Sequence, residues 1–292
     1  GNLAEAKRCV DQAISLDPTQ PPSLLLRAQI ALKNKDYLSA ERLANTVLQF
    51  EPDNTTAMLL LTRVLTHLDK AGEGLALLDK ALSNAQDNPA LRLERIRLLH
   101  HTNQFNTAIS ELKELTQRYP NDPAILTVYA EVLEEMGEKF EAIKMAQRAL
   151  RLGHERDKSQ SFDEHIGLHI LLGKLLHQTG QLDQAIQHLT EAVQSEPTLL
   201  EPYLELAQIY KERRDNGQAL NLFQQAMKTA PEDHRPYYLA GLLLKETKDY
   251  LGAEKMLRKA AKLAPNELPI QRQLGALVAL NLVHNRSTAH PL

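Results

Sequence analysis

The amino-acid sequence predicts an all-α solenoid, in which helix-turn-helix units stack side by side, rather than a globular enzyme fold. The first observation is a proline that recurs along the chain, at Pro18, Pro52, Pro120, Pro197, Pro231 and Pro265. The gaps between these prolines are 34, 68, 77, 34 and 34 residues, and a step of this length is typical of stacked helical hairpins. The second is composition: Ala and Leu dominate, aromatic residues make up 4% and Trp is absent, which favours helices throughout.

The third observation is that small residues form columns when the chain is aligned on this step. One column opens the second helix of each hairpin, with Ala6, Ala40, Ala108, Ala142, Ala185, Ala219 and Ala253. Another lies in the first helix, with Ala28, Thr62, Ala130, Gly173, Ala207, Gly241 and Gly275. Small residues let two helices cross closely, and larger apolar residues such as Leu112, Leu189, Phe223 and Leu257 would fill the space between hairpins.

The step divides the chain into a half unit at 1–20, seven full units and a last helix at about 268–283. The full units begin near residues 21, 55, 89, 123, 166, 200 and 234. The half unit corresponds to the second helix of a hairpin, so we expect the chain to be a fragment of a longer protein. We also expect its apolar residues Leu3, Val10 and Ile14 to be exposed, which would allow self-association through this end.

One gap exceeds two steps by nine residues, and the excess lies in the polar segment 153–165. This insertion is interpreted either as a recognition loop or hinge between two sub-arrays, or as a longer loop with an extra helical turn. The second interpretation is favoured, because closing a slightly longer loop costs little free energy. The predicted organisation is an N-terminal sub-array at 1–152, the insertion at 153–165, a C-terminal sub-array at 166–284 and a polar tail at 285–292.

Charge and cysteine content exclude several classes of function. The formal net charge is −3, with 24% charged residues, so the whole chain does not attract nucleic acid or acidic lipid. The single cysteine, Cys9, excludes an internal disulfide framework and a multi-cysteine zinc site. The sequence contains no apolar run long enough to cross a membrane, so we expect no membrane insertion.

The sequence predicts no catalytic residues, no metal site and no cofactor. It contains neither a nucleophile motif of the Gly-x-Ser-x-Gly kind nor a phosphate-binding glycine-rich loop. His165 and His169 are four residues apart and would share a helix face, but no third ligand follows at a spacing that clearly completes a metal site. The favoured interpretation of this pair is a polar helix start.

Two stretches, Gly180-Gln181-Leu182-Asp183-Gln184-Ala185 and Lys35-Asp36-Tyr37-Leu38-Ser39-Ala40, resemble the tetratricopeptide repeat family, and the resemblance covers nearly the whole chain. It departs from the family pattern where Gln86 and His154 replace the boundary proline and where Arg92 stands at a site that is often large and apolar. The resemblance implies a right-handed superhelix with a C-terminal capping helix. It also implies that the first helix of each hairpin lines a concave groove that holds extended or helical peptides.

Residues one step apart on the groove side are expected to be spatial neighbours. The candidate partner-binding residues are Arg63, Arg97, His67, His100, His101, Glu131, Gln29 and Lys174. Arg63, Arg97 and the histidines would form a basic patch, followed by acidic residues that begin with Glu131. Two interpretations stay open: the opposite charges pair with each other across units, or Arg63 and Arg97 hold a carboxylate of a partner through charge-assisted hydrogen bonds.

The function predicted from these observations is a non-catalytic scaffold that holds a protein or peptide, with an acidic segment, in the groove. Apolar residues such as Leu26 and Leu60 would contact the bound segment. The alternative is an accessory segment that positions a substrate for a larger enzyme or polysaccharide-export protein. Binding of RNA is disfavoured by the acidic balance and by the lack of an extended basic stripe.

Overall fold

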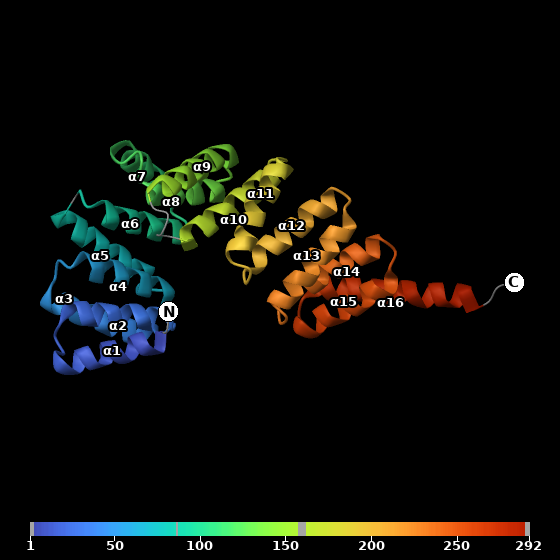
Figure 1. Cartoon of the computed structure of the whole chain (residues 1–292), viewed down its shortest axis with the longest axis horizontal. Helices are drawn as coiled ribbons and strands as arrows, with labels where there is room; N and C mark the ends of the chain where they lie inside the picture. Colours follow the sequence, from blue (N-terminus) through green and yellow to red (C-terminus); the bar gives the residue numbers. More distant parts are fainter. Residues whose placement is uncertain (1–2, 86, 157–161, 290–292) are drawn as a thin grey trace. The chain divides into compact units, whose positions relative to one another are not determined.

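The computed structural model describes residues 3–85, 87–156 and 162–289, and over these residues it contains sixteen α-helices and no strand. Gln86 and the middle of the predicted insertion, residues 157–161, lie outside the described residues. No described helix has both the length and the apolar character that a membrane crossing requires. The predicted all-α array of stacked helical hairpins is therefore confirmed (Figure 1).

The chain divides into two compact units, Gly1–Glu138 and Lys139–Leu292. The first unit contains α1 (Leu3–Leu16), α2 (Pro21–Lys33), α3 (Tyr37–Phe50), α4 (Thr55–His67), α5 (Ala71–Asn84), α6 (Pro89–His101), α7 (Phe105–Arg118) and α8 (Pro123–Glu135). Each helix packs against the next one along the chain, and the first helices of successive hairpins also contact one another, α2 with α4, α4 with α6 and α6 with α8.

The second unit contains α9 (Lys139–Arg156), α10 (Phe162–Gln178), α11 (Leu182–Ser195), α12 (Leu200–Glu212), α13 (Asn216–Thr229), α14 (Arg235–Glu246), α15 (Tyr250–Leu263) and α16 (Leu268–Ala289). The last helix packs against α15 and ends six residues beyond the predicted position 283, so the predicted polar tail is helical as far as Ala289. The two units divide between α8 and α9, whereas the sequence places its division at 153–165. That proposed division into sub-arrays stays a prediction.

The turn inside each hairpin repeats with the same period as the sequence. Residues with positive φ occur at Lys35, Asp69, Asn103, Gly137, Gly180, Arg214 and Lys248. Successive positions are 34 residues apart, except across the insertion, where the interval is 43 residues. Several helices begin with an Asn or Asp whose side chain accepts a hydrogen bond from the first turn, as Asn54 does from the Ala57 N–H at 2.9 Å. The turns thus recur at the period of the sequence, and Asn or Asp caps mark the start of several helices.

Most members of the small columns are buried where the two helices of a hairpin cross, whereas Gly275 on the last helix is exposed. Ala28, Ala40 and Ala108 are fully buried, and so are the larger residues Leu112 and Leu189. At Gly173 the approach is closest, because a Cβ added there would lie 2.4 Å from the Leu189 Cγ atom. Gly241 repeats this arrangement against Leu257, at 2.8 Å. The predicted packing of small against large residues is confirmed.

The predicted exposure of the N-terminal apolar face is wrong. Val10 is only 6% exposed, and Ile14 packs against a buried cluster that contains Leu24 and Val47. The physical reason is that α2 covers α1 as it would cover the second helix of a complete hairpin. The side chain of Leu3 lies outside the described residues. The described residues of this face therefore do not supply the surface that was predicted for self-association.

The close crossing of α10 and α11 makes a testable prediction. Gly173→Ala should lower the free energy of unfolding by about 1–3 kcal/mol, because the added methyl group overpacks the contact with Leu189. Gly167→Ala, on an open and exposed face of the same helix, should instead raise it by about 0.5–1 kcal/mol. Urea unfolding followed by circular dichroism measures both, and equal effects of the two substitutions would contradict the crossing.

Candidate functional site

On α2, α4, α6 and α8, the side that carries Gln29, Arg63, Arg97 and Glu131 forms a surface that we call the first-helix face of the first unit. At its centre Arg63 of α4 donates hydrogen bonds from Nε and Nη2 to the two carboxylate oxygens of Glu94 on α6, at 3.3 and 3.5 Å. Arg97, also on α6, donates from Nη1 to Glu94 Oε2 at 3.4 Å. The structure therefore brings Arg63 and Arg97 together on one carboxylate.

Burial differs sharply within this group of three charges. The Glu94 side chain is only 7% exposed, whereas those of Arg63 and Arg97 are 52% and 37% exposed. A buried carboxylate needs compensating partners, and the two guanidinium groups supply them. Within these three residues, two positive charges share one negative charge, and both guanidinium groups are accessible to solvent.

The predicted histidines have separate surroundings. His67 is exposed and stacks on Tyr37 of α3, with ring centroids 4.8 Å apart. His100 is half-buried beside Phe105, and burial lowers its pKa, so the imidazole is held neutral there. His101 is exposed at the end of α6. None of these contacts joins a histidine to Arg63 or Arg97.

The remaining predicted residues lie at other places on the first helices. Gln29 is exposed on α2, and Glu131 is half-buried on α8. Lys174 is half-buried on α10 and belongs to the second unit. The acidic residue that joins the two arginines is Glu94. The spacing of Glu94 and Arg97, three residues apart on one helix, was the sequence signal for this contact.

In the second unit, polar and charged side chains contact each other across successive first helices. His177 of α10 contacts Glu205 and Glu212 of α12, at 3.2 and 3.0 Å. Lys211 of α12 donates to Glu246 of α14 at 2.7 Å, and α14 in turn contacts α16 through Lys245. These groups are half-buried or exposed, so each pair stabilises the stack by a fraction of 1 kcal/mol to about 1 kcal/mol. In this part of the chain, therefore, the polar side chains of the first helices contact one another between successive hairpins.

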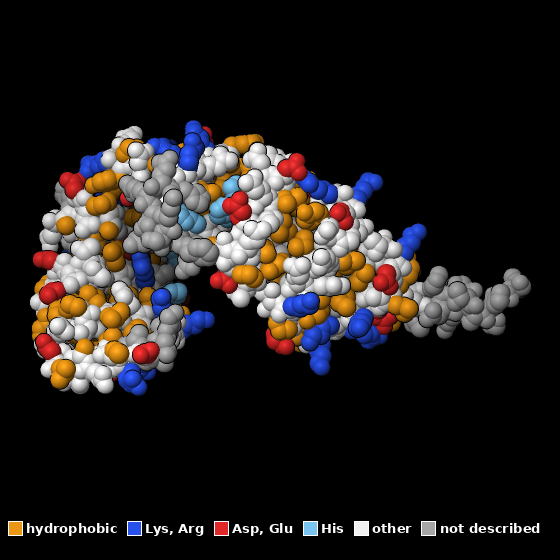
Figure 2. All heavy atoms as spheres, viewed as in Figure 1, with side chains coloured by type: hydrophobic (Ala, Val, Ile, Leu, Met, Phe, Trp, Pro, Cys, Tyr) orange, Lys and Arg blue, Asp and Glu red, His pale blue; other side chains and the backbone are white. Residues whose placement is uncertain are grey.

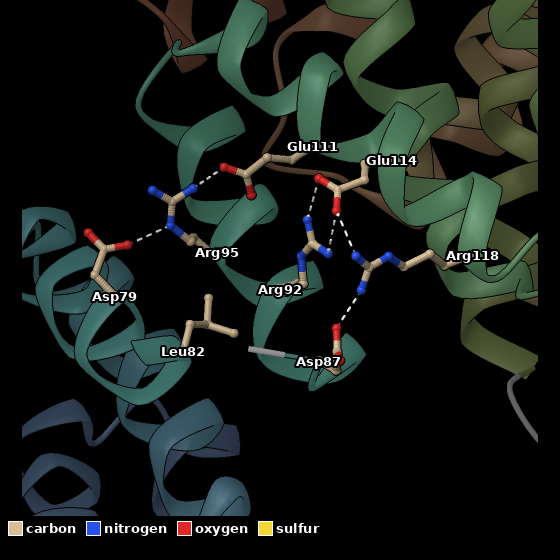
Figure 3. Close-up of a pocket in the computed structure, with 8 residues that line it drawn as sticks. All are labelled: Asp79, Leu82, Asp87, Arg92, Arg95, Glu111, Glu114 and Arg118. Carbon is tan, nitrogen blue, oxygen red and sulfur yellow. Dashed lines mark hydrogen bonds and ion pairs between the residues drawn. The ribbon is translucent and has the colours of Figure 1, made fainter. Parts of the chain in front are cut away.

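A second charged region of the first unit is a pocket of about 440 Å³ between α5, α6 and α7 (Figure 3). It is lined by Asp79, Leu82, Asp87, Arg92, Arg95, Glu111, Glu114 and Arg118. Arg92 and Arg95 lie on the opposite side of α6 from Glu94 and Arg97, because successive residues of a helix are turned by about 100°. The pocket is therefore separate from the first-helix face.

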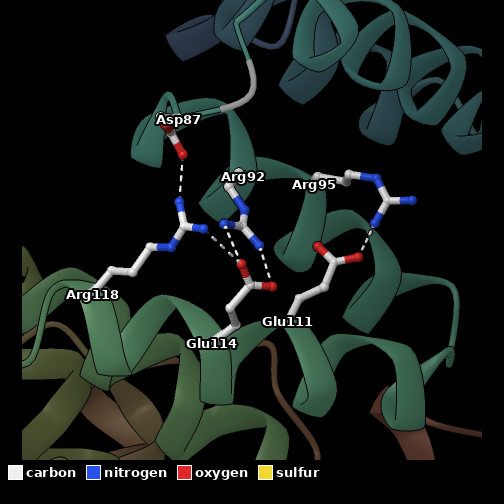
Figure 4. A network of polar contacts seen from close by, with 6 residues as sticks. All are labelled: Asp87, Arg92, Arg95, Glu111, Glu114 and Arg118. Atoms are coloured by element: carbon white, nitrogen blue, oxygen red, sulfur yellow. Dashed lines mark hydrogen bonds and ion pairs between the residues drawn. The ribbon is translucent and has the colours of Figure 1, made fainter.

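The pocket contains an ion-pair network made of two chains of contacts (Figure 4). Arg92 donates two hydrogen bonds to Glu114, at 2.9 and 3.2 Å, and Arg118 joins Glu114 to Asp87. Arg95 joins Asp79 to Glu111 in the same way. The network has three guanidinium groups and four carboxylates, so every guanidinium is paired and a formal charge of −1 remains. It links α6 to α5 and α7, and does not offer an open anion site.

The contact between Arg92 and Glu114 recurs in other hairpins with different chemistry. His169 Nδ1 lies 3.3 Å from Glu191 Oε2, and Lys259 Nζ lies 5.7 Å from the centre of the Tyr237 ring. In all three pairs the residues are 22 positions apart and join the two helices of one hairpin. Sequence reasoning noted Arg92 as unusual but missed Glu114 and the rest of the network. The sequence signal for this contact was the oppositely charged Glu114, 22 positions after Arg92.

Charges of both signs are interspersed on the visible face of each unit (Figure 2). This distribution agrees with the small net charge of the chain and with pairing between neighbouring helices.

Comparison with known proteins identifies the repeat. The tetratricopeptide repeat profile matches residues 31–96, 65–132 and 176–243, and a second profile of the same description matches residues 234–267. A search of curated proteins found no sequence match.

Solved structures share the fold at low sequence identity. A chain of the APC/C hetero-tetramer Cut9-Hcn1 matches with a TM-score of 0.70 and 13% identity, over 94% of this chain and 52% of that one. Yeast Tom70 matches with a TM-score of 0.65 and 19% identity, over 86% of this chain and 52% of that one. YrrB, described as a TPR protein with an unusual peptide-binding site, matches with a TM-score of 0.54 and 19% identity, over 67% and 96%. This chain thus spans about half the length of the first two.

The network predicts a pH effect that Arg92 controls. Its hydrogen bonds hold the pKa of the Glu114 carboxyl below the ordinary value, and Arg118 adds to the effect. Because the folded-state pKa is depressed, this carboxylate stabilises the fold above its unfolded pKa, and the stabilisation is lost as the pH falls through the folded pKa.

Arg92→Leu, which copies Leu24 and Leu126 at the same register, should therefore raise the pKa of Glu114 and remove part of the loss of stability in acid. An NMR titration of the carboxyl groups measures the pKa directly. Asp36, whose pKa is lowered by Ser39 on α3, is the internal control and should titrate as in the wild type. A Glu114 pKa that does not move would show that Arg92 is not its main partner.

Proposed function

We propose that this chain, which belongs to the tetratricopeptide repeat family, is a non-catalytic scaffold that binds an acidic segment of a protein partner on the first-helix face of its first unit. The observation that carries the proposal is the group formed by Arg63, Arg97 and Glu94, in which two guanidinium groups that are accessible to solvent share one carboxylate. A guanidinium group pairs well with a carboxylate, because its planar N–H donors match the two oxygens.

Glu94 contributes to such a site by holding the two arginines in place. Its buried carboxylate contacts both guanidinium groups, so their orientation is partly fixed before a partner binds. Less side-chain freedom is then lost on binding, which favours affinity. The distances of 3.3–3.5 Å are longer than those of a tight ion pair, so the arginines retain capacity for an incoming carboxylate.

An apolar contact beside the charges would add to the binding free energy. Leu26 of α2 is 46% exposed and is available for such a contact. Leu60, which the sequence suggested for the same purpose, is buried among Ala28, Leu61 and Leu65 and is not available. The related chain YrrB is described as having a peptide-binding site, which supports a peptide segment as the kind of partner.

The proposal predicts the effect of reversing one charge. Peptides selected from a random library for binding to the wild-type chain should be enriched in Asp and Glu. Arg63→Glu should weaken their binding by at least about 1.5–3 kcal/mol, the value of a hydrogen bond to a charged group. Isothermal titration measures the affinity, and raising the salt concentration should reduce it for the wild type.

Arg42→Glu is the matched control, because Arg42 is exposed on α3 of the same unit, where it contacts Ser39, and carries the same charge change. The selected peptides should bind this variant as they bind the wild type. Equal losses for Arg42→Glu and Arg63→Glu, or no loss for either, would remove the proposed site.

A further inference from the structure

We propose that His169, His188 and Glu191 form a binding site for one divalent transition-metal ion of the zinc class, which would join α10 to α11. The three residues come from the two helices of one hairpin in the second unit. His169 lies on α10, and His188 and Glu191 lie three residues apart on one side of α11. Imidazole nitrogen with carboxylate oxygen is a donor set that zinc accepts in proteins.

The distances between the donor atoms fit a single ion. The Nδ1 atoms of His169 and His188 are 3.0 Å apart, and His169 Nδ1 lies 3.3 Å from Glu191 Oε2. One donor atom from each residue lies within 4.8 Å of the other two. Bonds of 2.0–2.2 Å from a tetrahedral zinc ion place its ligand atoms about 3.4 Å from one another. The three side chains therefore already converge at the spacing of a ligand set.

Burial also suits metal binding. His169 is buried and His188 is half-buried, which favours the neutral imidazole that acts as a ligand. The Glu191 side chain is 45% exposed, so an ion has access from solvent and a fourth position stays open to water.

The equivalent positions in a hairpin of the first unit are occupied by charged residues of the ion-pair network. His169, His188 and Glu191 each stand 77 residues after Arg92, Glu111 and Glu114 of the ion-pair network. There, the guanidinium of Arg92 supplies the positive charge that faces Glu114. In the later hairpin an imidazole replaces the guanidinium, and a bound metal ion would supply the positive charge that faces Glu191.

This inference corrects the sequence-based search for ligands. That search paired His169 with His165 along one helix and found no third ligand. In the structure, His165 faces α9, because a Cβ added at Gly153 would lie 2.3 Å from the His165 Nε2 atom. His169 contacts His188, nineteen residues later on the next helix. A ligand search along one helix therefore missed the convergence of two.

The experiment uses the full chain without a histidine tag. Isothermal titration with Zn²⁺ should show one site, and Zn²⁺ should raise the midpoint of thermal unfolding, because an ion that binds the folded state stabilises it. A chelator should reverse the rise, and Mg²⁺ should not reproduce it, since imidazole ligands suit zinc rather than magnesium. No binding of Zn²⁺, or equal effects of Zn²⁺ and Mg²⁺, would overturn the site.

Two variants separate metal binding from simple packing. His169→Leu copies Leu24 and Leu126, which occupy the same register in folded hairpins, so it should fold and yet lose the Zn²⁺-dependent rise. Glu191→Gln keeps the shape of the side chain and should weaken Zn²⁺ binding at least tenfold. Even the loss of a residue that only orients a metal ligand typically weakens metal binding by about tenfold or more, and Glu191 would be a ligand itself. His101→Gln, at an exposed histidine of α6, is the control and should bind as the wild type does. Retained binding in His169→Leu, or equal weakening in His101→Gln, would show that these residues are not the ligands.

Discussion

The structure depends on the close crossing of two helices within each hairpin. Where Gly173 meets Leu189 and Gly241 meets Leu257, no side-chain atom separates the backbone of one helix from a leucine of the other. This crossing fixes which residues face each other inside a hairpin. Stacking of hairpins in turn fixes which first helices are neighbours, as α4 and α6 are. Because contacts in such an array are made between adjacent elements, each polar site described above is local to one or two hairpins.

Helix α6 shows how one element carries two charged surfaces with different consequences. On the side that faces α5 and α7, Arg92 and Arg95 are paired with carboxylates of both neighbours, so their charges stabilise the stack and offer little to a ligand. On the other side, Arg97 and the neighbouring Arg63 share the single carboxylate of Glu94. The two sides thus differ in their ratio of opposite charges: carboxylates outnumber guanidinium groups in the network, whereas two guanidinium groups share one carboxylate at Glu94.

The period of the sequence was sufficient to predict the fold, the small columns and the neighbouring positions of Arg63 and Arg97. The period was not sufficient to predict contacts between the two helices of a hairpin. Aligning the chain on the period shows which residues occupy the same site in successive hairpins, but not which sites face each other within one hairpin. Arg92 with Glu114 and His169 with His188 belong to this missed class. Val10 and Leu60 were misplaced for a different reason: apolar residues on the side of a helix that faces the next helix are covered by it. Whether such a side chain is buried depends on the direction in which it points from its helix axis, and the sequence period does not give that direction.

The central claim is that residues on successive first helices contact each other directly, and a double-mutant cycle on Arg63 and Glu94 tests it most directly. The free energy of unfolding in urea is measured for the wild type, Arg63→Met, Glu94→Gln and the double variant. Residues in contact are coupled by about 0.5–3 kcal/mol, and the account predicts a coupling in this range. Additive effects, within about 0.3 kcal/mol, would show that the two side chains do not interact and would contradict the account.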